Sequence, residues 1–329
     1  MTAQGIACVR AGLALLLGLA SGRGWAQEPL PAPTHPLHFG YYQTDGRFGD
    51  SASEVGCYTN LYVSQARLGY ECDAEDGNDL WLPWMRDGLC RAGTEGRDIF
   101  LTLNLQEEQP GRVTPIDDVL QVAAPVWNRV RYIEIAERPE WSQAQTENKL
   151  AFVRGKLTAF NLPLPPGGLG ITYQSTVPGL SHILDTPGIL ASLDWVGIQA
   201  HDPAGISRAP LVEKMQAWTG RVMTQTSKNM VLNVMAYAPG AWINDVGTLI
   251  TLQTVPYEFA WDNERVLAIT LFRYGGARGT REIWQLQEAH MQMGEAILGG
   301  PLPGGCVPTP RPPRETTCPP YDYLPPESW

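Results

Sequence analysis

The sequence predicts an α/β fold, a single-domain (β/α)8 TIM barrel with Pro-rich extensions at both ends. Eight short apolar runs of strand length are spread along the chain, and segments rich in helix-forming residues lie between them. Alternation of strands and helices implies a parallel sheet. Eight runs, with no Gly-rich phosphate turn after the first, favour the closed barrel over a doubly wound open sheet, which is the alternative fold.

The predicted barrel spans residues 38–298, and its strands are short runs that mostly end in polar or aromatic residues. In chain order, the runs are residues 38–42, 60–65, 99–105, 130–136, 168–174, 193–200, 230–237 and 266–272. Between them, residues 147–160, 210–219 and 280–298 have the composition of helices. Pro-rich segments flank the barrel, a lead-in at 27–37 and a tail at 299–329.

Side-chain alternation predicts which residues face the barrel axis. In the fourth run Ile133 and Ile135 suit the helix-facing side, so Tyr132, Glu134 and Ala136 should face the axis. The same alternation places these further side chains inside: Asn60, Tyr62, Ser64, Thr102, Asn104, Gln199, His201, Asn233 and Tyr237. A barrel interior built for stability alone favours Val, Ile and Leu. The polar upper interior therefore indicates a functional site at the carboxyl ends of the strands.

A secretory signal peptide is predicted at residues 1–26. Arg10 precedes an apolar stretch at residues 11–20, and small residues flank Trp25 at the exit. The stretch is well short of the ~20 residues that span a membrane, so a membrane anchor is the weaker alternative. We therefore expect cleavage after Ala26, no membrane insertion afterwards, and a secreted or periplasmic protein.

The chain is acidic, and its charge excludes several classes of partner. Cleavage would remove Arg10 and Arg23 and no acidic residue, so the formal net charge would change from -10 to -12. An acidic chain with no basic stretch is a poor partner for nucleic acid or anionic lipid. The five histidines are scattered and no CxxC pair is present, so we expect neither a metal nor another cofactor.

Export makes disulfides the default interpretation of the cysteines that follow the signal peptide. Cys306 and Cys318 flank a short Pro-rich loop, and their pairing would close a small ring in the tail. Cys72 and Cys90 could pair within the segment after the second run, which would leave Cys57 over. Spacing alone leaves other connectivities open.

A cluster of carboxylates follows the fourth run and is the strongest candidate for chemistry. Glu134, Glu137 and Glu140 lie at or just beyond the predicted strand. Glycoside hydrolysis needs one carboxylic acid to protonate the leaving oxygen and a second group that acts as nucleophile or activates water. The alternative is structural, with Glu137 and Glu140 capping the next helix and Glu134 pairing with an arginine.

The segment Tyr132-Ile-Glu-Ile-Ala-Glu-Arg-Pro139 resembles the fourth strand of the (β/α)8 glycoside hydrolases whose motif ends in Asn-Glu-Pro. Arg138 stands where that family has its acid/base glutamate, and arginine stays protonated near neutral pH. Glu137 stands in the Asn position of that motif, so either Glu137 has taken over as the general acid/base from a shifted position or the usual acid is lost. The first alternative requires that the strand ends or bulges before Glu137. No glutamate follows the seventh run, so the second carboxylate would be Asp45 or Asp202.

A weaker resemblance is to chitinase-like glycoside hydrolases. Phe39-Gly-Tyr-Tyr42, Val196–Asp202 and Val231–Tyr237 are similar to their first, sixth and seventh strands. The fourth strand of that family carries Asp-x-Asp-x-Glu, and here Ile133 and Ile135 replace the aspartates. This replacement disfavours a substrate-assisted mechanism.

Aromatic and amide side chains at the predicted strand ends indicate a carbohydrate partner, because sugars stack on rings and hydrogen-bond to polar groups. The rings are Tyr41, Tyr42, Trp141, Tyr173, Tyr237, Trp242 and Tyr274. The polar candidates are Gln43, Asn104, Glu134, Gln174, Gln199, His201 and Arg273. We predict a secreted glycoside-hydrolase-like protein that acts on an oligo- or polysaccharide. The alternative is a non-catalytic carbohydrate-binding barrel.

Overall fold

The structure is a computed structural model. It describes residues 29–42, 55–65, 81–103, 105, 116–137, 141–174, 185–200, 217, 219–235, 246–272, 280, 283–304 and 306. The fold lies within the unit Pro31–Trp329. The predicted signal peptide lies outside the described residues. Part of the lead-in is described, and within it Thr34 N donates to Trp261 O at 2.8 Å.

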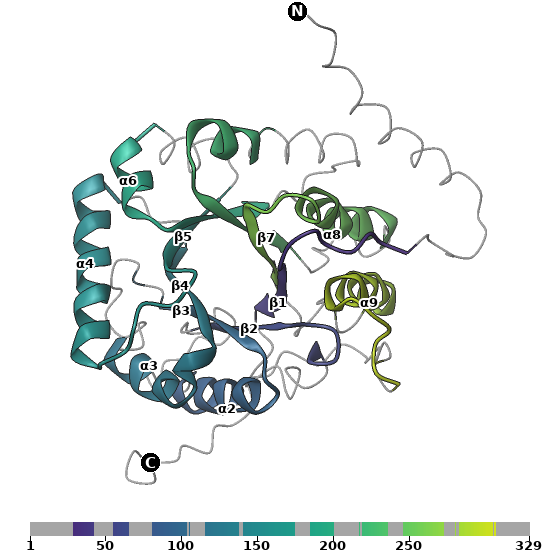
Figure 1. Cartoon of the computed structure of the whole chain (residues 1–329), viewed down its shortest axis with the longest axis horizontal. Coiled ribbons are helices and arrows are strands. Elements are labelled where there is room, and N and C mark those ends of the chain that lie inside the picture. Colours follow the sequence, from purple (N-terminus) through teal and green to yellow (C-terminus); the bar gives the residue numbers. More distant parts are fainter. Residues whose placement is uncertain are drawn as a thin grey trace, which may run out of the picture. The chain divides into compact units, whose positions relative to one another are not determined.

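Eight parallel strands form the barrel, which confirms the predicted fold class (Figure 1). The strands are β1 (His38–Tyr42), β2 (Leu61–Gln65), β3 (Asp98–Thr102), β4 (Val130–Glu137), β5 (Leu169–Gln174), β6 (Trp195–Ala200), β7 (Asn229–Met235) and β8 (Val266–Phe272). They are hydrogen-bonded in the order β1-β8-β7-β6-β5-β4-β3-β2. All seven pairings are parallel, as strand–helix alternation predicts.

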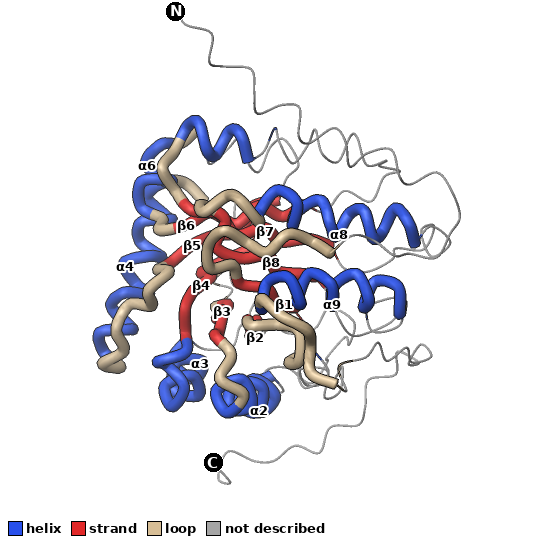
Figure 2. Tube along the Cα trace, turned by 45° about the vertical axis from the view of Figure 1, so that its right-hand side comes forward, coloured by secondary structure: helices blue, strands red, loops and turns tan. Residues whose placement is uncertain are grey.

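Helices surround the strands, as the tube view also shows (Figure 2). They are α2 (Trp81–Thr94), α3 (Ile116–Ala123), the 3-10 helix η3 (Ala124–Arg129), α4 (Gln143–Ala159), α6 (Pro187–Ser192), α8 (Val246–Ala260) and α9 (Trp284–Leu298). The helices expected at 147–160 and 280–298 correspond to α4 and α9. Most of the helix expected at 210–219 lies outside the described residues.

Local sequence explains where α4 begins and which face it buries. Ser142 is the N-cap: its hydroxyl accepts from Gln145 N at 3.3 Å, and Gln145 Oε1 accepts from Ser142 N at 2.8 Å. This reciprocal pair is a capping box, which satisfies two amide groups that the helix itself leaves unpaired. Thr146, Leu150, Val153 and Leu157 recur at helical spacing and are the buried face.

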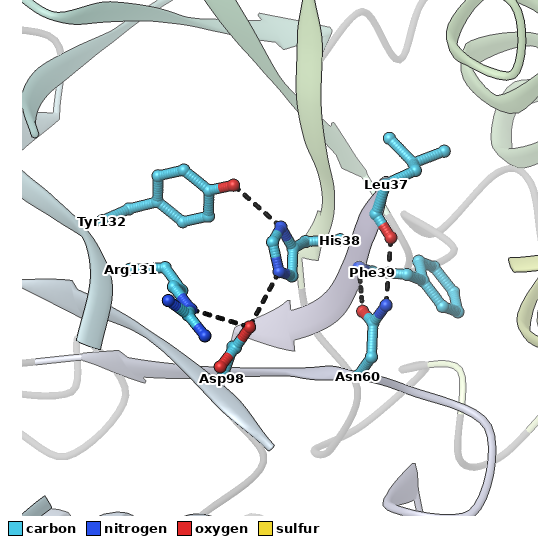
Figure 3. Close-up of polar contacts among 7 residues, drawn as sticks. All are labelled: Leu37, His38, Phe39, Asn60, Asp98, Arg131 and Tyr132. Carbon is cyan, nitrogen blue, oxygen red and sulfur yellow. Dashed lines mark hydrogen bonds and ion pairs between the residues drawn. The ribbon is translucent and has the colours of Figure 1, made fainter. Parts of the chain in front are cut away.

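The ends of the sheet, β1 and β2, meet through a side chain (Figure 3). Asn60 Oδ1 accepts from Phe39 N at 2.7 Å, and Asn60 Nδ2 donates to Leu37 O at 3.0 Å. The amide thus bonds to two backbone groups on one edge of β1, as a neighbouring strand would. A Cβ on Gly40 would lie 2.2 Å from Leu61 O, so only glycine allows the two backbones to come this close.

The lower interior of the barrel is filled with apolar and aromatic side chains. Phe100 lies between Tyr132 and Trp195, with ring centroids 5.8 and 5.4 Å away. The Trp195 ring covers Gly170, where a Cβ would lie 2.1 Å from the indole. Leu61 and Val63 pack in the same cluster. These side chains fill the part of the barrel interior nearer the start of the strands.

The expected alternation of β2 is wrong by one residue. Val63 pairs with Phe100 and packs with it inside the barrel, so Leu61 and Val63 occupy the positions expected for Tyr62 and Ser64. Tyr62 lies on the other face, with the guanidinium of Arg97 5.7 Å from its ring centroid. The expectation counted Asn60 as the first interior residue of the strand. Asn60 instead precedes β2, and its side-chain amide bonds to the backbone of β1, so the alternation of β2 begins at Leu61.

A disulfide joins Cys57 to Cys306, with the two Cα atoms 5.8 Å apart. The expected Cys306–Cys318 pairing is therefore wrong, and so is Cys72–Cys90, because Cys90 is a free, exposed thiol. The physical reason is the return of α9 toward the turn before β2. A Cβ on Gly294 of α9 would lie 2.2 Å from Tyr58 O, so the helix packs directly on that turn. The disulfide fits a protein of an oxidising compartment.

A buried histidine on α9 connects this helix to β1. Tyr41 OH bonds to His290 Nδ1, and Tyr58 OH donates to Tyr41 OH at 3.4 Å. Because His290 is completely buried, desolvation lowers its pKa to about 3. The ring is therefore neutral in the folded protein over most of the acid range.

We expect His290 to make the folded state less stable as the pH falls. The unfolded chain protonates this histidine below a pKa of about 6.5, whereas the folded chain stays neutral down to about pH 3. Between these values the unfolded state binds one more proton, so the free energy of unfolding should fall by about 1.4 kcal/mol per pH unit. Urea unfolding at pH 6.5 and 5.0 should show a smaller loss in His290→Asn than in the parent. Equal losses would contradict the expectation.

Candidate functional site

A layer of buried polar side chains crosses the upper half of the barrel, toward the carboxyl ends of the strands. Its members are Thr102, Glu134, Thr172, Gln199, Asn233 and Thr270. Neighbouring members are paired in the sheet: Thr102 with Glu134, Gln199 with Asn233, and Asn233 with Thr270. Paired residues face the same side of a sheet, so these paired side chains share the interior face of the barrel. The polar upper interior agrees with the alternation argued from the sequence for Thr102, Glu134, Gln199 and Asn233.

Glu134 is the acidic residue of this layer, and its side chain is only 4% exposed. The Thr172 hydroxyl donates to Glu134 Oε1. Tyr42 OH lies 3.4 Å from both carboxylate oxygens and donates to them. Hydroxyl donors stabilise a buried ionised carboxylate, which would otherwise be costly to remove from water. A Cβ on Gly197 would lie 2.1 Å from Thr172 Oγ1, so the absence of a side chain there leaves room for the Thr172 hydroxyl.

A β-bulge in β4 separates Glu134 from Glu137. Against β5, Glu134 pairs with Gly170, Ala136 with Ile171, and Glu137 with Thr172. Ile135 is the extra residue, and it shifts the alternation by one position. Ala136 therefore pairs on the helix-facing side and not on the axis side where regular alternation placed it. The bulge also meets the condition for an acid/base role of Glu137, because it pairs this residue with the interior position Thr172. Only the backbone of Glu137 is described.

Besides Glu134, the structure brings two predicted binding residues to this layer. Tyr42 bonds to Glu134, and Gln199 is buried beside Asn233. The backbone of Gln174 pairs with Gln199 at the end of β5. These further predicted candidates lie outside the described residues: Gln43, Asp45, Asn104, Glu140, His201, Asp202, Tyr237, Trp242, Arg273 and Tyr274.

Tyr41 and Tyr173 are not brought to the interior. Tyr173 follows Thr172 and pairs with Ile198, so it lies on the helix-facing side of β5. Its burial raises the pKa of its hydroxyl above the ordinary value. Tyr41 alternates with Tyr42 and bonds to His290 on α9. Both tyrosines are therefore packing residues of the layer between strands and helices.

Sequence reasoning missed Thr172, the donor that holds Glu134. The signal was present, because in the run 168–174 Thr172 alternates with Ile171 and Tyr173, which suit a buried helix-facing side. Thr270 in the last run was missed in the same way, although it also faces the interior. Neither threonine is near an acidic residue in sequence, so their proximity to the carboxylate depends on the register of the closed sheet.

A second polar network lies at the opposite end of the barrel, where β1, β3 and β4 begin (Figure 3). His38 Nε2 is 3.0 Å from Asp98 Oδ2, Tyr132 OH is 2.8 Å from His38 Nδ1, and Arg131 Nε donates to Asp98 Oδ2 at 2.9 Å. Burial favours a higher pKa for Asp98, but the hydrogen bonds from His38 and Arg131 outweigh it, and the pKa is lowered. Active sites of (β/α)8 barrels lie at the carboxyl ends, so this network joins strands structurally.

Within the described ranges, no three His, Cys, Asp or Glu side chains gather closely enough to hold a metal ion. No helix among the described residues is both long and apolar enough to cross a membrane.

The fold and this interior define a (β/α)8 barrel with a buried carboxylate near the carboxyl ends of its strands. No protein-family model matches the chain, and no curated protein matches it in sequence.

Solved structures that resemble the chain include glycoside hydrolases, the superfamily that its fourth strand resembles in sequence. One is a psychrophilic glycoside hydrolase family 10 endo-beta-1,4-xylanase, with 11% identity, a TM-score of 0.49, and coverage of 72% of this chain and 86% of the other. Another is a GH30 endoxylanase from Clostridium papyrosolvens C71 (12%, 0.45, 82% and 73%). A third is a chitinase from Ipomoea carnea (13%, 0.43, 79% and 97%). At 11–13% identity these likenesses concern the fold alone.

Proposed function

We propose that this protein is an exported glycoside-hydrolase-like barrel that cleaves an oligo- or polysaccharide by carboxylate general acid/base catalysis. Glu137 is the proposed acid/base. The observation that carries this proposal is the β4 bulge, which pairs Glu137 with Thr172 at an interior position. Without the bulge, alternation would pair Glu137 with the helix-facing residues, and the acid would be missing from the site.

The second carboxylate of the proposed reaction is Asp45 or Asp202. These residues follow β1 and β6 in sequence, and residues that follow barrel strands are the ones that build active sites in this fold. Tyr42, Gln174 and Gln199 belong to the same end of the barrel. Tyr237, Trp242, Arg273, Tyr274, Asn104 and His201 are proposed sugar-binding residues from the segments after the strands.

Export is part of the proposal. Its support is the predicted signal peptide at residues 1–26 together with the Cys57–Cys306 disulfide, since disulfides persist in oxidising compartments. The formal charge of the chain is -10, which supports a neutral or modestly charged glycan as partner and not nucleic acid.

The second candidate function is carbohydrate binding without catalysis. Two observations favour it: Arg138 occupies the position of the family's acid/base glutamate, and residues 234–242 after β7 contain no glutamate. Such a barrel would keep the aromatic and amide residues and would lack the pair of carboxylates that hydrolysis requires.

A paired screen separates the two candidates. The secreted protein is incubated with a panel of neutral, acidic and amino-sugar polysaccharides, and released reducing ends are measured alongside binding by affinity electrophoresis. Hydrolysis of any glycan supports the enzyme. Binding without hydrolysis supports the non-catalytic barrel, and the absence of both would contradict a carbohydrate function.

We expect Trp242→Ala to weaken glycan binding by about 1–3 kcal/mol, the scale of removing an aromatic side chain at a binding hot spot. Trp242 follows β7, and a ring at that end can stack on the apolar face of a sugar. The matched control is Trp284→Ala, because Trp284 is 47% exposed on α9. Isothermal titration with a bound oligosaccharide measures both. Equal affinities in the parent and Trp242→Ala would assign Trp242 a structural role.

A further inference from the structure

The strand β1 has a backbone ladder on one edge and a side-chain contact on the other. Its backbone pairs with β8, and β1 and β2 stand at the two ends of the hydrogen-bonded order. On the edge toward β2, the Asn60 amide bonds to the backbone of Leu37 and Phe39 (Figure 3). A strand with a ladder on one edge separates more easily than a strand with two ladders, because fewer backbone hydrogen bonds must break.

Two segments far apart in the sequence cover the outer face of β1. Tyr41 lies on that face, and its hydroxyl bonds to His290 of α9. The Tyr58 hydroxyl donates to Tyr41 OH at 3.4 Å, and the two rings meet edge to face with centroids 6.2 Å apart. Phe39 contacts the His290 ring, with centroids 6.3 Å apart. The helix α9 and the turn at residues 55–58 therefore both hold β1 against the barrel.

The Cys57–Cys306 disulfide joins these same two segments. Cys57 lies in the turn beside Tyr58, and Cys306 follows α9. The bond adds a covalent link to the packing of the helix on the turn, where a Cβ on Gly294 would lie 2.2 Å from Tyr58 O. Both cysteines are half-buried, so a small dithiol in solution can reach the bond.

The inner face of β1 contributes to the candidate site. Tyr42 follows Tyr41 and donates to the Glu134 carboxylate. At the start of the strand, His38 bonds to Asp98 of β3. Separation of β1 from β2 would therefore move Tyr42 away from the layer of polar side chains described above.

We propose that the Cys57–Cys306 disulfide is a redox latch on β1. When the bond is oxidised, α9 and the turn at residues 55–58 hold β1 in the closed barrel. When the bond is reduced, β1 opens from β2 ahead of the other strands and withdraws Tyr42 from Glu134. The latch is closed in an oxidising compartment and open where thiols are kept reduced.

The reductant is a dithiol. One of its thiolates attacks the sulfur of Cys57 or Cys306 and forms a mixed disulfide, and its second thiol then displaces the protein sulfur. The dithiol is oxidised to a disulfide, and the protein gains two electrons and two protons as two thiols.

Hydrogen exchange of the full chain, read by mass spectrometry, tests the latch without a glycan. The peptides compared cover β1 and β6, and β6 has a ladder on both edges. If the bond only restricts the unfolded chain, reduction speeds exchange in both strands by the same factor. The latch predicts that treatment with a dithiol speeds exchange in β1 by at least about tenfold more than in β6.

Two variants make the comparison specific to this bond. The double variant Cys57→Ser, Cys306→Ser lacks the bond without added reductant and should show the same excess exchange in β1. Cys90→Ser removes the free thiol of α2 and keeps the bond, so it should match the parent before and after treatment with the dithiol.

Equal acceleration of exchange in β1 and β6, in the treated parent or in the double variant, would overturn the latch. Loss of protection in every strand together, as in an unfolded chain, would overturn it as well. The exchange result stands whether or not the protein acts on a glycan.

In a parent that binds or cleaves a glycan, the loss of that activity on reduction should equal the fraction of molecules with β1 open, and reoxidation should restore it. A loss that does not follow the open fraction would overturn the link between the latch and Tyr42.

Discussion

Glu137→Gln should lower the rate of glycan hydrolysis by about 10²–10⁴-fold and leave glycan binding nearly unchanged. General acid/base participation typically contributes a factor of this size. The substitution keeps the length and shape of the side chain and removes the transferable proton. The rate constant should therefore fall while the affinity for a bound oligosaccharide stays within about twofold, a change well below the 1.4 kcal/mol that corresponds to a factor of ten.

The control for this variant is Glu264→Gln, which removes a charge from an exposed residue just before β8. Rates are measured by release of reducing ends, and affinities by titration with the same oligosaccharide. Hydrolysis by Glu137→Gln at the parental rate would show that another group is the acid. Loss of binding together with hydrolysis would indicate that Glu137 supports the fold of the site.

Removal of the Cys57–Cys306 disulfide should lower the free energy of unfolding by about 2–5 kcal/mol, the usual range for a native disulfide in a secreted domain. The cysteines are 249 residues apart in sequence, so the bond closes a loop that includes nearly the whole barrel. In the chain-entropy account, a longer loop restricts the unfolded chain more strongly. The double variant Cys57→Ser, Cys306→Ser is compared with the parent by urea unfolding.

Cys90→Ser is the matched control, because Cys90 is a free, exposed thiol on α2 and its substitution should change the stability by less than about 0.5 kcal/mol. Peptide mapping of the non-reduced protein should recover Cys57 and Cys306 in one linked fragment. A fragment that links Cys306 to Cys318, or equal stability of the double variant and the parent, would contradict the assignment.

The fold was predictable because its evidence is local. Each strand is a short apolar run, and helix-forming segments such as 147–160 separate several of the runs. Burial of Ile133 and Ile135 on one face and of Tyr132 and Glu134 on the other also follows from the period of a strand. These features depend on neighbours along the chain, and the structure preserves them as β4 and α4.

The candidate site was predictable only in part. The chain alone identifies Glu134, Glu137, Tyr42 and Gln199 as candidates, since their residue types and positions at strand ends suit carbohydrate chemistry. It does not show that Thr172 holds Glu134. It also does not show that Tyr173, one residue later, belongs to the packing layer, because both facts depend on the register between β4, β5 and β6.

By itself, the sequence determined the eight-stranded alternating architecture, the polar upper interior and the position of the acidic cluster after the fourth strand. Only the tertiary structure decided three matters: the bulge that pairs Glu137 with Thr172, the alternation of β2, and the pairing of Cys57 with Cys306. The physical reason is common to all three. Apolar periodicity depends on the residue's own strand or helix, whereas a bulge, a strand's starting register and a disulfide depend on which distant backbone lies alongside when the barrel closes.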